Sequence, residues 1–144
     1  MRRILLDTSV FSRYLDSSRS GDDNKITREI ARYLLEHPKI EFSVLSRFEK
    51  ERGLRDMGAT VQLDALDRLC RQPIVHPVDE KAASRAAEMW AILKKQGRVP
   101  SDVDLLIAAT ADVNGCIVAY ADRDFENFRE FVETEDWLDD SKSE

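Results

Sequence analysis

The sequence is poor in the residues that form many small active sites. It has only two cysteines, Cys70 and Cys116, and neither stands in a CxxC motif or a Cys/His metal spacing. We therefore expect two buried thiols, with no bridge between them in a reducing compartment. The two histidines, His37 and His76, stand alone and far apart, and we assign neither a catalytic role.

Long apolar runs are also missing. No run approaches the roughly 20 residues that a bilayer span needs. Two arginines at positions 2 and 3 precede an apolar stretch that ends after residues 4–6, whereas a secretory signal has an apolar region of about 7–15 residues. We therefore expect a cytoplasmic protein without a membrane partner.

The sequence has no excess of positive charge, since its formal net charge is −6. That value alone argues against a polyanionic partner. The charge is uneven, however, because residues 122–144 hold 10 acidic and 3 basic residues and carry −7. The rest of the chain carries +1, so a polyanion could still bind to the body of the protein.

Apolar residues follow a pattern typical of alternating strands and helices. We expect strands at residues 4–6, 40–44, 73–78 and 116–121, a last edge strand at 131–133, and a polar loop at 17–24. Helices are expected at 9–15, 26–34, 46–55, 59–70, 79–96 and 101–114, with Asp79 and Ser101 as N-caps and with Trp90 and Leu93 in the core. This order predicts a three-layer α/β/α sandwich with a central, mostly parallel sheet over residues 1–134, followed by an acidic C-terminal tail at 135–144.

Acidic side chains from four separate segments should meet at one edge of that sheet. In a parallel sheet, sites form outside the carboxyl ends of the strands. Two segments place their acids directly after strands, and two place them near the start of helices that begin at the same edge. These residues are Asp7, Glu49, Asp102, Asp104, Asp122 and Asp124.

Such a cluster of carboxylates predicts a divalent cation. Carboxylates packed closely together repel one another, and their burial is costly unless a cation compensates. Ligation by oxygen alone suits Mg²⁺ or Mn²⁺, either of which could activate a water for attack. Each residue also has a structural explanation: Asp7 could end a strand, Glu49 could be a solvated helix partner, and Asp102 and Asp104 could serve only a helix N-terminus. Asp122 and Asp124 could be turn residues.

The same residues resemble the four motifs of PIN-domain nucleases of the VapC type. The first is LDTSV at residues 6–10, the second SVLSRFEKERG at 43–53, the third DLLIAATA at 104–111, and the fourth lies at 118–125. The resemblance implies a cytosolic, Mg²⁺- or Mn²⁺-dependent endoribonuclease. It also implies the toxin of a type II toxin–antitoxin pair, which forms homodimers and is inhibited by a small antitoxin protein.

Carried over by position, the resemblance assigns the metal-binding, catalytic roles to Asp7, Glu49, Asp104 and Asp122. Asp124 and Asp102 remain as further candidate ligands. The fourth motif commonly has Thr or Ser where this chain has Ala119 and Ala121, so a polar group that would orient the site is missing or replaced.

Substrate contacts are expected from three further residues. Thr8 and Ser9 could hydrogen-bond to the site or cap the first helix, and Arg98 lies in the loop that leads to the third motif. RNA would be the substrate.

Three other readings compete with a nuclease. A phosphatase of the haloacid dehalogenase type needs an Asp where Ser9 stands. A receiver domain needs an acidic pair where Leu6 precedes Asp7. A PIN-like scaffold that binds RNA or protein without cutting it stays open as the alternative.

Overall fold

Five parallel strands form the centre of the protein. The computed structural model describes residues 2–21 and 24–138, and in it the strand order is β3-β2-β1-β4-β5, with every neighbouring pair parallel. The strands are short: β1 (Ile4–Leu6), β2 (Glu41–Ser43), β3 (Ile74–His76), β4 (Ile117–Tyr120) and β5 (Thr134–Asp136). The central strand β1 is buried along its whole length, as its continuous apolar run predicts.

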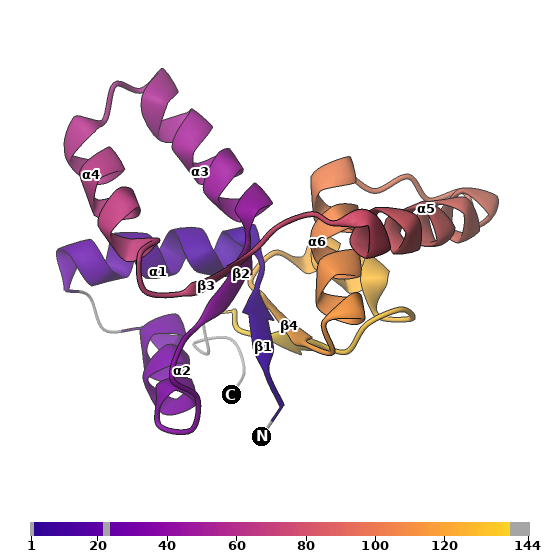
Figure 1. The fold of residues 1–144 in the computed structure, drawn as a ribbon, viewed down its shortest axis with the longest axis horizontal. Coiled ribbons are helices and arrows are strands. Elements are labelled where there is room, and N and C mark those ends of the chain that lie inside the picture. Colours follow the sequence, from indigo (N-terminus) through magenta and orange to yellow (C-terminus); the bar gives the residue numbers. More distant parts are fainter. Residues whose placement is uncertain (1, 22–23, 139–144) are drawn as a thin grey trace.

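Helices cover both faces of the sheet, which confirms the expected three-layer α/β/α fold. The helices are α1 (Thr8–Ser20), α2 (Lys25–Leu34), α3 (Val44–Asp56), α4 (Thr60–Leu69), α5 (Glu80–Lys95) and α6 (Asp102–Val113), and a 3₁₀ helix, η1, spans Arg123–Phe128. In Figure 1, α1 to α4 lie to the left of the sheet, and α5 and α6 lie to its right.

The alternation of side chains along the strands produces two hydrophobic cores. Ile4 and Leu6 of β1 point into the core that lies under α1, α2 and α4. Leu5, between them, points into the core formed with α5 and α6. The strands are therefore buried on both faces, and the open positions for polar groups are at their ends.

The N-caps of α5 and α6 are the predicted ones. Asp79 accepts a hydrogen bond from the Ala82 backbone N–H, and Ser101 accepts one from the Asp104 backbone N–H. These caps set where each helix begins. For α6, the cap places Asp102 and Asp104 in the first turn.

Two boundaries differ by three residues or more from those that the sequence predicts. Residues 17–20, expected in a loop, continue α1 to Gly21, whose φ of 78° ends the helix. The strand expected at 131–133 lies at Thr134–Asp136 instead, because Phe131 and Val132 pack against the core beneath α6. Residues 22–23 of the expected loop lie outside the described residues.

The expected acidic tail begins inside the sheet. Glu135 and Asp136 belong to β5, and Trp137 is buried. Residues 139–144 of that tail lie outside the described residues.

The expected role of Trp90 is also corrected. Met89 and Leu93 fill the core under α5, whereas Trp90 is 37% exposed on the outer side with Lys94 over its ring. No helix among the described residues is long and apolar enough to cross a membrane.

Candidate metal-binding active site

Asp7 lies buried at the carboxyl end of the central strand. It is only 3% exposed, and it is the N-cap of α1. The Val10 backbone N–H donates to its Oδ1 at 2.9 Å, and the Ser9 hydroxyl donates to Oδ1 and Oδ2 at 2.7 and 3.0 Å. These bonds fix the orientation of the carboxylate.

Ser9 also ties Asp7 to the neighbouring strand. The Ala121 backbone N–H, just past the end of β4, donates to the Ser9 hydroxyl at 3.0 Å. Here Ser9 provides the polar link to a strand end whose own side chains, Ala119 and Ala121, carry no hydrogen-bonding group. Ser9 therefore orients the carboxylate instead of capping the helix.

Thr8 joins the first strand end to α3. Its hydroxyl donates to Glu49 Oε1 at 2.7 Å. Because the single Thr8 proton is used there, the nearby Ser46 hydroxyl, 3.0 Å away, donates to Thr8. Ser46 was not singled out from the sequence, although it precedes Glu49 by three residues and so shares its helix face.

The electrostatics show that the acids from different segments act on one another. Burial, together with the negative charges of Asp104 and Asp122, raises the pKa of Asp7 to about 7 against the opposing effect of the hydrogen bonds from Val10 and Ser9. Burial likewise raises the pKa of Asp104, with additional repulsion from Glu49, Asp122 and Asp124. Asp7, Glu49, Asp104, Asp122 and Asp124 thus form one electrostatic group, hereafter the acidic site.

Asp122 and Asp124 have different places in this group. Asp122 acts on both Asp7 and Asp104, and it also accepts a hydrogen bond from the Asp124 backbone N–H that starts η1. Both side chains are exposed. Of the two, Asp122 stands closer to the centre of the acidic site.

The acidic site has little positive charge to balance it. Among the described residues, Asp7, Asp104, Asp122 and Asp124 have no basic partner within ion-pair distance, and Glu49 has only Arg52, at 3.9 Å. Uncompensated carboxylates of this kind favour a bound cation. The donor set, oxygen alone, fits a hard divalent ion.

The carboxylates do not close around a single point. In the described part of the chain, the one set of three ligand atoms that all lie within 4.8 Å of one another belongs to Glu41, His76 and Cys116. Mg²⁺ keeps several waters and binds through one or two carboxylates, so the wider spacing of the acidic site suits it.

The Glu41 cluster already contains a cation, the side chain of Arg3. Its guanidinium donates to both carboxylate oxygens of Glu41, and His76 Nε2 lies 2.7 Å from Oε1. Burial would raise the pKa of Glu41, but the hydrogen bonds from Arg3 and His76 outweigh it and lower the pKa to about 2. Burial raises the pKa of the Cys116 thiol to about 11. We interpret this cluster as an ion-pair network that joins strands, a role that the sequence did not indicate for His76.

Two of the expected site residues have contacts outside the acidic site. Asp102 lines a cavity with Ala86, Ala87 and Trp90 of α5, because residues two positions apart on a helix point in different directions. Arg98 pairs with Glu130 at 3.0 Å and donates to the backbone carbonyl of Asn127.

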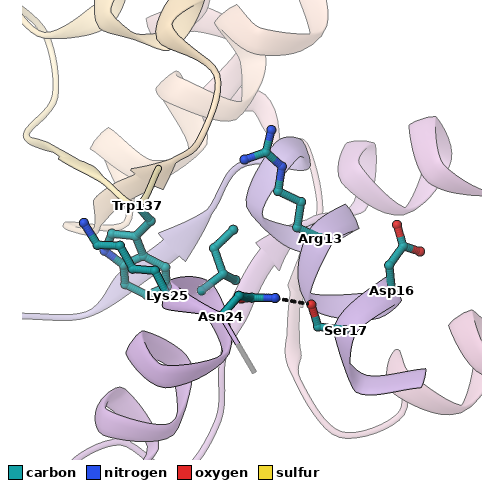
Figure 2. Close-up of a pocket in the computed structure, with 7 residues that line it drawn as sticks. Arg13, Asp16, Ser17, Asn24, Lys25 and Trp137 are labelled. Atoms are coloured by element: carbon teal, nitrogen blue, oxygen red, sulfur yellow. Dashed lines mark hydrogen bonds between the residues drawn. The ribbon is translucent and has the colours of Figure 1, made fainter. Parts of the chain in front are cut away.

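A separate cavity of about 250 Å³ lies where α1 meets the start of α2 (Figure 2). Asn24 donates to Ser17 across it at 2.7 Å, and Trp137 forms one wall. None of the acidic-site residues lines this cavity.

Several solved structures of VapBC proteins have a fold similar to that of this chain. The chain is similar to a chain of DNA-bound VapBC from Salmonella typhimurium, with a TM-score of 0.79, 20% identity, and 96% of this chain and 100% of that chain covered. VapBC-1 from nontypeable Haemophilus influenzae gives a TM-score of 0.74 at 24% identity, covering 93% and 97%. VapBC-5 from Mycobacterium tuberculosis gives 0.66 at 26% identity, covering 94% and 98%.

The sequence comparisons give one match. No curated protein matches the sequence significantly. The sequence profile of the PIN domain matches residues 4–130, which span all four motifs and the whole acidic site. The chain belongs to the PIN domain family.

Proposed function

We propose that this protein is a metal-dependent endoribonuclease that hydrolyses RNA phosphodiesters. The observation that carries the proposal is the electrostatic coupling of Asp7, Asp104 and Asp122, which come from three segments and have no basic partner among the described residues. Membership of the PIN domain family supports the same activity, because PIN domains are generally nucleases.

The residues of the acidic site fit Mg²⁺ or Mn²⁺. Asp7 and Asp104 would hold the ion most directly, with Asp122 and Glu49 reaching it directly or through water, and with Asp124 at the margin. A bound ion of this kind would lower the pKa of a water and offset charge on the scissile phosphate.

The chain's own residues prepare the acidic site for that ion. Ser9 and the Val10 N–H hold the Asp7 carboxylate in one orientation, and Thr8 does the same for Glu49. Burial raises the pKa of Asp7 to about 7, and a bound cation would favour its ionised form. The absence of a paired nucleophile and base among the described residues of the site favours attack by water.

We further propose that the protein is the toxin of a type II toxin–antitoxin pair. The solved structures that it resembles are VapBC complexes, and one is described as a member of the VapBC family of toxin–antitoxin systems. By that likeness, the protein would act in the cytoplasm, form homodimers and bind a small antitoxin.

Cleavage of RNA by the purified protein tests the enzymatic proposal. The parent protein should cut single-stranded RNA in Mg²⁺ or Mn²⁺ and stop when EDTA is added. Asp104→Asn should abolish cleavage, whereas Asp102→Asn, two residues away, should retain it because Asp102 lies beside α5. Cleavage that persists in Asp104→Asn would defeat the assignment.

A growth assay tests the toxin role. Expression of the parent chain should slow growth, and Asp104→Asn should restore it. Growth arrest that persists in Asp104→Asn would point to a non-catalytic scaffold, and harmless expression of an active nuclease would rule out the toxin role.

A further inference from the structure

Phe48 is an aromatic side chain exposed beside the acidic site. It lies on α3, directly before Glu49, and half of its surface, 51%, is exposed. A single exposed apolar side chain is ordinary on a protein surface, so its contacts must say what it does. What links this ring to the acidic site is Arg52, which contacts both Phe48 and Glu49.

Arg52 connects this ring to the acidic site. Its guanidinium carbon lies 5.0 Å from the centroid of the Phe48 ring, which is the geometry of a cation–π pair. The same guanidinium lies 3.9 Å from Glu49 Oε2. One arginine side chain therefore spans the interval between the ring and the carboxylate.

The surroundings of the ring are concave and rich in arginine. Phe48 and Arg52 line a cavity of about 380 Å³ with Val44, Arg47, Glu51 and Arg55. Three of these side chains are basic and one is acidic, and Asp67 and Glu49 from outside the lining pair with Arg47 and Arg52. Glu51 holds Arg47 at 3.0 Å and Arg55 at 2.8 Å, which leaves Arg52 as the arginine that faces the ring.

Single-stranded RNA has the chemistry that fits this arrangement. An unpaired base stacks on aromatic side chains and on arginine guanidinium planes, and the adjoining phosphate is attracted by positive charge. A cation–π pair offers both at once, and its ring does not require a particular base, because every base has a π-face.

We propose that Phe48 and Arg52 form a subsite for an unpaired nucleobase, which holds RNA with its neighbouring phosphodiester at the acidic site. The inference rests on the proposed ribonuclease function and names the substrate form that it would take, unpaired RNA. Stacking supplies affinity at this subsite, and the carboxylates supply the chemistry.

Binding of two matched oligonucleotides tests the subsite. The protein, as Asp104→Asn so that it does not cut, is titrated with a fluorescent single-stranded oligoadenylate and with an abasic strand of equal length and charge. We expect tighter binding of the strand that carries bases, and we expect Phe48→Ala to weaken that binding about 5-fold or more while leaving the abasic strand unaffected.

Three further variants sharpen the result. Phe48→Tyr keeps an aromatic face and should retain the preference, and Arg52→Lys keeps the charge but loses the planar group and should weaken it. Leu35→Ala is the control for an exposed apolar side chain: Leu35 is 85% exposed just after α2, on the segment that enters the amino end of β2. It should change nothing.

The outcomes separate the subsite from the nuclease. The first outcome has two parts: Phe48→Ala added to Asp104→Asn leaves the binding of both strands unchanged, and Phe48→Ala alone cuts RNA at the parental rate. In that case the subsite is wrong and the nuclease assignment stands. If no cleavage occurs but the preference for bases depends on Phe48, the subsite stands and the nuclease assignment fails. If Phe48→Ala leaves RNA binding unchanged and instead releases a bound protein, the cavity is a protein-docking surface and the proposal is overturned.

Discussion

The Thr8 hydroxyl donates a 2.7 Å hydrogen bond to Glu49, a residue 41 positions later in the chain. The bond links the end of β1 to α3 across the edge of the sheet, and Ser46 supports it from the same helix. A hydrogen bond to an ionised group is stronger than one between neutral partners. The orientation of Glu49 toward the acidic site therefore depends on Thr8, the third residue of the first motif.

Loss of the Thr8 hydroxyl should weaken metal binding without unfolding the protein. Thr8→Val removes the donor but keeps the size of the side chain, so Glu49 would lose its orientation. We expect the affinity for Mn²⁺ to fall roughly 10- to 100-fold, as is usual when a partner of a ligand is removed. Isothermal titration of Thr8→Val and Thr8→Ser measures this, and equal affinity in the two variants would show that the hydroxyl does not position Glu49.

Asp7→Asn should abolish cleavage and still leave a well-folded protein. Asparagine is as good an N-cap as aspartate, so the bond from the Val10 N–H can be retained. It also removes a buried carboxylate that has no basic partner among the described residues. Thermal melts in EDTA should give a Tm equal to or above that of the parent, and Mn²⁺ should raise the Tm of the parent by more than it raises that of Asp7→Asn. A large loss of stability in Asp7→Asn would contradict this account of the site.

The metal-free protein should lose stability as the pH rises through the titration of Asp7. Burial raises the pKa of Asp7 from 3.8 to about 7, so folding favours its neutral form. The cost of ionisation is absent below pH 3.8 and complete above about pH 7. Urea unfolding in EDTA should therefore show the parent weakening relative to Asp7→Asn across this range. A constant difference between the two proteins would show that Asp7 does not titrate there.

The Glu41 network should contribute stability that acid removes. The folded pKa of Glu41 is lowered to about 2 from 4.5, so its contribution is present above pH 4.5 and is lost as the pH falls toward 2. Glu41→Gln should cost about 1–3 kcal/mol at neutral pH, because it loses hydrogen bonds between charged groups. Unfolding of both proteins at pH 7 and pH 3 should show the difference shrinking in acid. If the difference in stability between the two proteins is the same at both pH values, the bonds from Arg3 and His76 are not its cause.

The fold could be predicted from the sequence because its signals are local. The buried run of β1, the caps Asp79 and Ser101 and the apolar strand β4 each stand within a few residues, and the structure confirms them. The end of α1 was harder to predict, because polar residues 17–20 look like a loop and the helix stops only at Gly21. The position of β5 depends on where Phe131 and Val132 pack, which is a tertiary effect.

The acidic site could be predicted as a group, but the details of its members could not. Asp7 and Asp104 follow a strand end and a helix start, and parallel topology brings those ends together. Asp102 and Asp104 stand two residues apart on α6, and a helix turns by about 100° per residue, so their side chains point in different directions. The spacing in the sequence was therefore enough to predict that they have different surroundings. The bonds of Ser9 to Asp7 and Ala121 and the ion pair of Glu41 with Arg3 join residues distant in sequence, and no local pattern indicates them.

Titration of the purified, metal-free protein with Mn²⁺ tests the central claim most directly, with binding followed by calorimetry and by the electron paramagnetic resonance of the free ion. We predict that the parent protein binds Mn²⁺ and that Asp7→Asn and Asp104→Asn each bind it about tenfold more weakly or worse. A parent that fails to bind Mn²⁺, or variants that bind it as tightly as the parent does, would contradict a metal site built from these carboxylates.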